Sequence, residues 1–322
     1  MYRYILLGSL FIIASFFACK KEKYDNIGLH SKSDFGDNPG NLEMYYYEPE
    51  NHSTGMPLLV VLHGCSQNAA DIAELTEWNK LADSHGFYVL YPEQKTINNT
   101  TSCFNWFLEK DQERGKGEAK SIRNMIVQLQ KDKNLHANRT FVTGVSAGGA
   151  MSSVMISCYP EMFKGGAVLS GGPYKAAEKI TESAAALAGN VNKTAQEWGD
   201  LVRSQNIAYT GTYPKLLIFH GQDDNVVDIN NAGELVEQWT NVLGISDLPG
   251  EDVYVRPDVR QYIYENTEGD SLLIYYEVED MGHAIATDPG SGAQQGGGTG
   301  TFSNDKDFYS SYWIAHFFGL IN

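Results

Sequence analysis

The chain has 322 residues, of which 42% are hydrophobic, and its formal net charge is −16. This length is enough for one large hydrophobic core, and a single α/β domain of this size is ordinary. The strong negative charge argues against nucleic acid and anionic membrane surfaces as partners, because both would repel the protein.

The first eighteen residues are typical of an export signal. Arg3 supplies a short positive start, and the almost wholly apolar stretch from Ile5 to Ala18 is too short for a comfortable membrane span. Phe16-Phe17-Ala18-Cys19 resembles a bacterial lipoprotein box, which implies cleavage before Cys19 and lipidation of its thiol. The alternatives are an ordinary secretory signal and an uncleaved anchor.

Polar residues without a hydrophobic period follow this signal. They predict a lipoprotein tether over residues 19–40, with one folded domain over residues 41–322. We therefore expect an exported protein that meets a bacterial membrane, the outer membrane or cell surface, only through its N-terminal lipid anchor. The oligomeric state is left open.

The cysteines fit an exported protein, because disulfides are allowed in an oxidising compartment. If Cys19 carries lipid, three cysteines remain. Cys65 and Cys103 are the candidate pair, which leaves Cys158 as a buried free thiol, although sequence alone does not fix this connectivity.

From residue 58 onward, short apolar runs alternate with helical segments. Strands are expected over residues 58–62, 87–91 (stopped by Pro92), 139–143, 166–170, 216–219 and 272–278, and helices over 71–85, 118–135, 149–156, 231–242 and 308–320. This alternation predicts an α/β fold with a mostly parallel central sheet flanked by helices. Ligands of such sheets bind at the carboxyl ends of the strands, where we expect the chemistry.

Three segments depart from the alternation. Residues 174–214 predict a small helical insertion of two helices, either a cap beside the site or plain helical packing. Residues 261–264 and 272–275 predict a hairpin. Residues 290–300 hold six glycines and predict a mobile loop, because no Lys-Ser/Thr pair follows to make a phosphate cradle.

The stretch Gly144-Val145-Ser146-Ala147-Gly148 lies between a predicted strand and a predicted helix. In this context G-x-S-x-G indicates a nucleophile elbow, with the serine exposed on a sharp turn above a helix N-terminus. The alternative is a glycine-rich turn with a solvent-exposed serine.

A serine hydroxyl needs a base to take its proton, and the base needs an orienting carboxylate. In α/β-hydrolases these residues follow in the order Ser, Asp or Glu, His. The order predicts Ser146 as nucleophile, Asp224 as orienting acid and His283 as general base and acid, each just after a predicted strand. Asp223 is the nearest alternative acid and Asp228 a weaker third. For His283 the alternative is a buried histidine satisfied by local hydrogen bonds.

A tetrahedral intermediate needs two donors for its oxyanion. We expect the backbone N–H of Ala147 and, from the loop after the first of these strands, that of Cys65. His63 and His220 each precede a glycine at a strand end, where a structural role is expected. There is no H-E-x-x-H, no C-x-x-C and no helix-opening G-x-G-x-x-G, so neither a metal nor a nucleotide cofactor is expected.

Taken together, several stretches resemble one family, the esterases related to poly(3-hydroxybutyrate) depolymerases, which include feruloyl and acetylxylan esterases. The resemblance covers residues 41–318 and is carried by residues 62–67 (LHGCSQ), 103–107 (CFNWF), 144–151 (GVSAGGAM), 220–227 (HGQDDNVV), 281–284 (MGHA) and 310–313 (SSYW). It implies an α/β-hydrolase fold and a Ser-Asp-His triad in which the acid is Asp224.

The resemblance also implies an oxyanion donor at Cys65, a Cys65–Cys103 disulfide and a place for Trp106 near the substrate cleft, where simple core packing is the alternative. We therefore expect a cofactor-free serine esterase that attacks an ester-bearing polymer. Acetyl or feruloyl esters of xylan are favoured over polyhydroxybutyrate. The rival hypothesis is a non-catalytic glycan-binding lipoprotein on the same fold.

Overall fold

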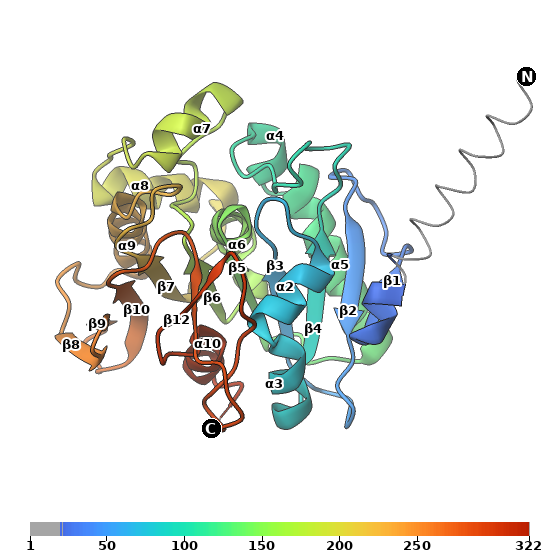
Figure 1. Cartoon of the computed structure of the whole chain (residues 1–322). Coiled ribbons are helices and arrows are strands. Elements are labelled where there is room, and N and C mark those ends of the chain that lie inside the picture. The colour runs from blue at the N-terminus through green and yellow to red at the C-terminus, as the bar shows by residue number, and fades with distance from the viewer. Residues whose placement is uncertain (1–19, 21, 322) are drawn as a thin grey trace, which may run out of the picture.

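The structure, a computed structural model, describes residue 20 and residues 22–321 (Figure 1). The predicted signal over residues 1–18 and the predicted lipidation residue Cys19 lie outside these residues. In the part of the chain that is described, no helix is both long and apolar enough to cross a bilayer.

One ten-stranded sheet forms the centre of the molecule, in the order β1-β2-β4-β3-β5-β6-β7-β10-β9-β8. The six strands from β4 to β10 in this order are parallel, and two antiparallel strands extend each edge. The predicted α/β class with a mostly parallel sheet is confirmed. The strands are β1 (Leu29–Lys32), β2 (Glu43–Tyr47), β3 (Leu58–Leu62), β4 (Tyr88–Glu93), β5 (Thr140–Val145), β6 (Gly165–Leu169), β7 (Lys215–Gly221), β8 (Glu251–Arg256), β9 (Val259–Glu265) and β10 (Ser271–Val278).

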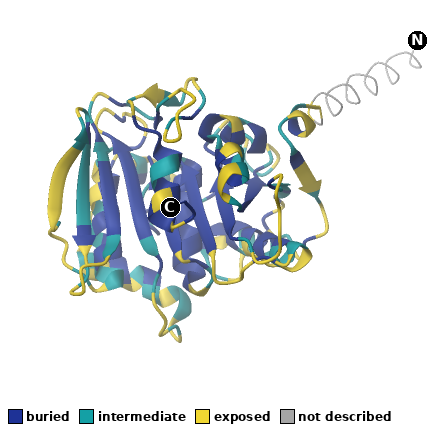
Figure 2. Cartoon of the chain, turned by 90° about the horizontal axis from the view of Figure 1, so that it is seen from below, coloured by how far each residue is buried: buried dark blue, intermediate teal, exposed yellow. Residues whose placement is uncertain are grey.

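Helices cover both faces of the sheet (Figure 1). Buried side chains of α2, α3 and α10 form a core on one face, and those of α5, α6 and α9 form a core on the other. Figure 2 shows the central strands buried between these layers, while β8 is exposed at the edge. The helices are α2 (Ala69–Thr76), α3 (Trp78–His85), α4 (Glu109–Gln112), α5 (Gly117–Lys133), α6 (Ala147–Cys158), α7 (Ile180–Leu187), α8 (Ala195–Arg203), α9 (Asn230–Leu243) and α10 (Ser310–Phe318), with 3₁₀ turns at Pro160–Met162 and Ser204–Asn206.

The neighbouring strands β3 and β5 lead into opposite layers. β3 is followed by α2 on one face, whereas β5 is followed by α6 on the other. The two connections therefore diverge at the carboxyl ends of these strands. In open α/β sheets such a switch point is where ligands bind, and it is where the predicted oxyanion loop and elbow lie.

The predicted tether over residues 19–40 is wrong in its extent, because the structure folds most of this segment onto the domain. Tyr24, Leu29 and Phe35 are buried, and β1 pairs with β2. Lys20 Nζ lies 2.8 Å from Glu93 Oε1, and the Tyr24 hydroxyl donates to Glu93 Oε2 at 2.6 Å. The buried apolar residues of this segment show no helical or strand period in the sequence, because they do not share one face of a single helix or strand. Each packs against the domain separately.

The single helix predicted over residues 71–85 is broken into α2 and α3. Glu77 separates them with a left-handed backbone (φ 49°), and its carboxylate accepts the Gly297 N–H at 3.1 Å. Gly298 N–H donates to Leu75 O at 2.9 Å. The glycine-rich loop predicted to be mobile is thus tied to this break, which a side-chain period cannot reveal.

Short strands account for the other differences. β4 continues through Pro92, which the sequence predicted to end the strand. The pairing of β4 with β3 ends at Leu90, so Pro92 lies beyond it, where the missing N–H of a proline is tolerated. β8 is exposed and was not predicted, and neither were β11 (Ile285–Thr287) and β12 (Ser303–Asp305), a separate two-stranded sheet that encloses the glycine-rich loop.

Candidate active site

Ser146 stands alone between β5 and α6 in a conformation that L-residues rarely adopt (φ 58°, ψ −122°). Glycine is required on both sides by close packing. A Cβ on Gly148 would collide with Leu62 O at the end of β3, and one on Gly144 would collide with Gly148 O. The strand, the turn and the helix are therefore pressed together, and the serine is held at the crest of the turn.

Asp224 and His283 are brought together from loops that follow β7 and β10. His283 Nδ1 lies 2.8 Å from Asp224 Oδ2, and the Asp224 side chain is fully buried while that of His283 is 12% exposed. Because a carboxylate only accepts, the hydrogen of this pair lies on Nδ1, which leaves Nε2 free to accept a proton.

Asp224 is held in its ionised form. Burial by itself would raise the pKa of Asp224, but donors from His220, His283 and Val227 outweigh burial and hold that pKa well below its usual range. The N–H groups of Val226 and Val227 each donate to Oδ1 at 2.9 Å. The carboxylate is thus oriented by groups on both of its oxygens.

The two alternative acids lie elsewhere. The side chain of Asp223 is exposed, and its N–H donates to Met281 O at 3.0 Å, which ties the two loops together. Asp228 Oδ1 accepts the Asn230 N–H at the start of α9. Of the three predicted candidates, only Asp224 has a hydrogen bond to His283 in the described structure.

The loop of His283 lies against the elbow. Ser146 N–H donates to Leu169 O, and the hydroxyl of the next residue, Ser170, is 3.4 Å from Ala284 O. Between the Ser146 hydroxyl and the His283 ring themselves, no hydrogen bond is formed in the described residues. Such contacts are often long without substrate and tighten when substrate binds.

The loop after β3 forms the other side of the elbow. A Cβ on Gly64 would lie 3.5 Å from Ser146 Cβ, and Gly64 N–H donates to the Gln67 side chain at 2.8 Å. Within the described residues, the N–H groups of Cys65 and Ala147 have no hydrogen-bond acceptor. Two free donors therefore flank Ser146.

A disulfide joins Cys65 to Cys103 and links this loop to the segment that carries Trp106. His63 is buried, with Nδ1 2.8 Å from Gly64 O and Nε2 accepting the Gln94 N–H at 3.0 Å. Burial lowers the pKa of His63, so it is a neutral structural group. Cys158 is a buried free thiol on α6, and burial raises its pKa to about 12.

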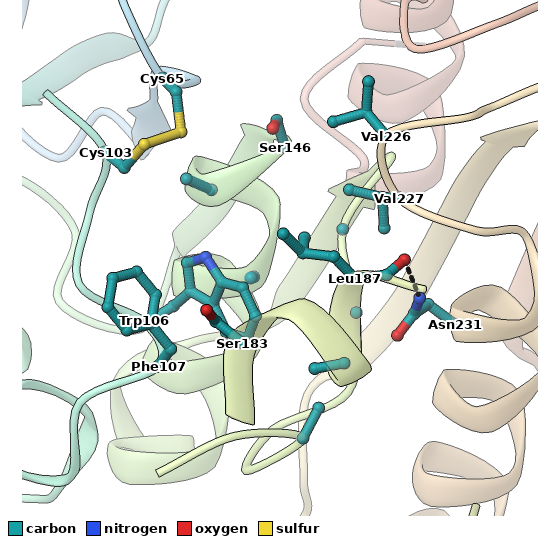
Figure 3. Close-up of a pocket in the computed structure, with 16 residues that line it drawn as sticks. Cys65, Cys103, Trp106, Phe107, Ser146, Ser183, Leu187, Val226, Val227 and Asn231 are labelled. Carbon is teal, nitrogen blue, oxygen red and sulfur yellow. Dashed lines mark hydrogen bonds between the residues drawn. A yellow bond between two sulfur atoms is a disulfide. The ribbon is translucent and has the colours of Figure 1, made fainter. Parts of the chain in front are cut away.

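An apolar cavity of about 130 Å³ opens beside Ser146 (Figure 3). Six of its lining residues are small: Ala147, Ala150, Gly171, Gly172, Ala176 and Ala186. The larger apolar groups in the lining are the Cys65–Cys103 disulfide, Trp106, Phe107, Leu187, Val226 and Val227, and its polar side chains are Ser146, Ser183 and Asn231. No charged side chain of the described chain lines it, so the cavity suits an uncharged group of a substrate.

Trp106 lies in the wall of this cavity, edge-on to Phe107 with ring centroids 5.4 Å apart. Helix α7 of the predicted insertion contributes Ser183, Ala186 and Leu187 to the lining, and Figure 3 shows Ser183 and Leu187 at the cavity. This helix lies beside the site as a cap. Sequence reasoning missed its individual lining residues, because small and aliphatic side chains carry no catalytic pattern.

Three carboxylates that do not line the cavity gather near one another, those of Asp288, Asp305 and Asp307, with oxygens within 4.8 Å of one another. They lie at the β11–β12 sheet and are partly or fully exposed. Exposed acidic groups of this kind commonly occur without an ion.

A parallel sheet in this order, with a serine elbow at its switch point, defines an α/β-hydrolase. The chain belongs to the esterase PHB depolymerase family, whose sequence profile matches residues 42–255. The resemblance expected from the motifs is confirmed.

The relatives are esterases. A poly(3-hydroxyalkanoate) depolymerase C of Paucimonas lemoignei is 42% identical over 90% of this chain and 69% of its own length. A feruloyl esterase B of Thermothelomyces thermophilus is 35% identical over 67% of this chain and 76% of its own. Among solved structures, an acetyl xylan esterase from Aspergillus awamori matches with a TM-score of 0.78 over 91% of this chain and 99% of its own, at 24% identity, and so shares the fold.

Proposed function

We propose that this protein is an exported serine esterase that hydrolyses carboxylic esters of an extracellular polymer. Ser146 attacks the ester carbonyl carbon while His283 Nε2 takes the hydroxyl proton, and Asp224 holds the imidazole for this transfer. His283 then gives the proton to the departing alcohol. Water attacks the acyl-serine by the same route and releases the acid. The hydrogen bond between Asp224 and His283 is the observation that carries this proposal.

The oxyanion of each tetrahedral intermediate is assigned to the free N–H groups of Cys65 and Ala147. The Ala147 N–H is the first of α6, so the positive end of the helix dipole adds to it. The Cys65 N–H comes from a loop restrained by the disulfide to Cys103 and by the hydrogen bond of Gly64 to Gln67. Fixed donors need no reorganisation as charge develops.

For the substrate, a poly(3-hydroxyalkanoate) is the first candidate. The 42% identity to a depolymerase of that polyester extends over 90% of this chain. The small apolar cavity beside Ser146 suits a short aliphatic acyl unit, with Trp106 and Leu187 against its side chain.

Acetyl or feruloyl esters of xylan are the second candidate, and a separate groove favours them. This groove of about 900 Å³ is lined in part by Ser66 and Ser102, the sequence neighbours of the two disulfide cysteines. Its lining combines charged side chains with hydroxyl and amide groups that can bond to a sugar chain. The charged residues are Lys20, Lys23, Glu43, Glu93 and Lys95, and the hydroxyl and amide groups include Ser66, Asn68, Thr96, Thr100, Thr101 and Ser102.

Export and anchoring belong to the proposal as well. The disulfide between Cys65 and Cys103 supports an oxidising compartment, because cytosolic disulfides are rare. Lipidation of Cys19 would fix the chain to a membrane surface. Mass spectrometry of the protein from a membrane fraction tests it by the presence of a lipid-bearing N-terminal peptide.

The decisive experiment compares wild type with Ser146→Ala on three substrates: poly(3-hydroxybutyrate), acetylated xylan and methyl ferulate. We expect wild type to release acid from at least one of them and the variant to be slower by a factor of about 10⁴ or more. Equal rates would falsify Ser146 as the nucleophile. Binding of xylan without hydrolysis by either protein would favour a non-catalytic glycan-binding protein instead.

A further inference from the structure

His220 is a buried imidazole beside the proposed triad, and the mechanism above gives it no role. It lies near the end of β7, with 1% of its side chain exposed. Within the described chain, the structural His63 is hydrogen-bonded only to backbone groups. His220 lies beside a backbone carbonyl and also beside the carboxylate of the proposed triad.

The contacts of His220 fix where its hydrogen lies. Nε2 is 2.8 Å from Val227 O and 3.4 Å from Asp224 Oδ2. A carbonyl oxygen only accepts, so the hydrogen is on Nε2 and donates to Val227 O. The same N–H presents its positive end to Oδ2, which also receives the hydrogen of His283 Nδ1. Oδ2 therefore lies beside two imidazole nitrogens.

The bond to Val227 O also shapes the turn that holds the acid. Asp224 Oδ1 accepts the N–H groups of Val226 and Val227 from this turn. Tying Val227 O to β7 keeps these donors in place, so His220 acts on both carboxylate oxygens. We propose that His220 is a positioning residue of the triad: it fixes the orientation of the Asp224 carboxylate and through it the imidazole of His283. This inference rests on the proposed Ser146–His283–Asp224 triad.

The proposal has an electrostatic signature. The N–H of His220 offsets part of the negative charge on Oδ2, and its removal would leave more of that charge facing His283. A stronger charge favours the protonated imidazole, so the acid limb of the pH–rate profile moves to higher pH.

The neighbouring charges stay the same in every His220 variant, so such a shift reports on Asp224. β6 carries no charged residue on one side of β7. On the other side Glu277 of β10 is in register with His220 and accepts from Gln222 and Tyr262. The titratable groups placed against His220 are Asp224 directly, Glu277 by strand register and His283 through Asp224, and Asp223 and Asp228 follow on the same loop.

The test measures kcat and KM against pH for wild type, His220→Leu and His220→Gln. We expect His220→Leu to lower kcat by about 10- to 100-fold, with the acid limb raised by about 0.5 pH unit or more. The Gln amide nitrogen reaches the place of Nε2 and donates to Val227 O. His220→Gln should therefore restore the wild-type limb and most of the rate.

The proposal is overturned if the acid limb of His220→Leu coincides with that of wild type, whatever the rate. It is also overturned if the acid limb of His220→Gln is displaced as far as that of His220→Leu. If His220→Leu does not fold, His220→Asn replaces it, since its side chain is too short to reach Val227 O. The limb should then move in the Asn variant and not in the Gln variant.

Two controls separate this proposal from others. His63→Leu removes a buried imidazole at the end of β3 that is bonded only to backbone groups, and its limb should not move. Asp224→Asn tests the triad itself. Wild-type kcat in Asp224→Asn would refute the proposed function, whereas a large loss in Asp224→Asn with an unmoved His220→Leu limb refutes only the role of His220.

Discussion

Ser146 adopts a backbone conformation that costs about 1–3 kcal/mol in general, and the surrounding packing must supply this energy. Gly148 is the residue on which that packing depends most directly, because its missing side chain lets α6 approach Leu62 O at the end of β3. The elbow is therefore specified by contact between two strands and a helix as much as by the turn itself.

This packing predicts that Gly148→Ala is strongly destabilising. The added methyl group collides with backbone that cannot rotate away, so we expect a loss of at least about 2 kcal/mol in the free energy of unfolding. Gly233→Ala on α9 is the matched control, since it has open space, and should stabilise by up to about 1 kcal/mol. Urea denaturation measures both. Equal stabilities would contradict the packing argument.

At this scale, sequence reasoning named the three residues that the proposed mechanism uses, and it missed residues such as His220 whose proposed role depends on contacts. Ser146 and His283 follow predicted strands in the order that α/β-hydrolases use. Asp223 and Asp224 are adjacent in the sequence, and only the folded loops show which side chain faces His283. The Asp223 N–H is bonded to Met281 O, whereas the Asp224 carboxylate is bonded to His283. The role of His220 depends likewise on a turn that closes only in three dimensions.

Among the elements, the start of α5 supports two walls of the site. Glu118 is buried, and its carboxylate accepts from the side chains of Gln94 and Asn105 and from the Asn105 N–H. Gln94 in turn donates its N–H to His63, and Asn105 precedes Trp106. One carboxylate thus connects the segment after β4 to the wall of the cavity.

Glu118 gives a pH dependence with a defined sign. Burial, together with the nearby Asp111 carboxylate, raises the pKa of Glu118 from 4.5 to about 8. Between these values the folded state binds the proton more tightly than the unfolded state, so the free energy of unfolding falls as pH rises from 4.5 to 8.

We expect Glu118→Gln to show a weaker fall than wild type in urea denaturation across this window. Glu182→Gln is the control, since that exposed carboxylate has a lowered pKa and should keep the wild-type slope. If all three proteins lose stability in parallel, Glu118 does not titrate there.

Helix α7 contributes Ser183, Ala186 and Leu187 to the lining of the cavity. Leu187→Ala should enlarge it and raise the ratio of kcat/KM for p-nitrophenyl hexanoate over the acetate by about tenfold, a change that one or two methylene groups can produce. Ile180→Ala lies on the same helix, where Ile180 is 67% exposed and does not line the cavity, and should leave the ratio unchanged. An unchanged ratio in Leu187→Ala would remove α7 from substrate selection.

The elements themselves were largely predictable where a long apolar period exists, as in β3, α5 and β7. Prediction failed for β8, β11 and β12, which are too short or too exposed to bury a periodic face. It also failed at Glu77, where one left-handed residue divides a helix whose side-chain period runs on unbroken.

At the scale of the whole molecule, the N-terminal segment is part of the folded domain. Glu93 is almost fully buried, and its charge is met by Lys20 and the Tyr24 hydroxyl from this segment. The sequence does not indicate this contact, because Lys20 and Tyr24 lie 73 and 69 positions from Glu93 and only the folded chain brings them together.

A chain that begins at Asn41 should therefore be less stable than one that begins at Lys20. It loses the buried side chains of Tyr24, Leu29 and Phe35, worth about 1.5–3 kcal/mol each, and leaves Glu93 with fewer partners. Thermal unfolding of the two chains measures the difference. Coincident melting curves would mean that the segment adds nothing to the domain.

In the proposed reaction, the uncharged lining of the cavity affects how the enzyme releases the acid after the ester is cleaved. At neutral pH the released acid is an ionised carboxylate. Among the described residues, no cationic side chain lines this space to replace the water that hydrates that charge. The cavity therefore binds the uncharged acyl group of the ester better than the carboxylate that hydrolysis produces. We therefore expect the accumulated acid to inhibit ester hydrolysis only weakly. The uncharged primary amide of the same acyl group should be a much stronger inhibitor.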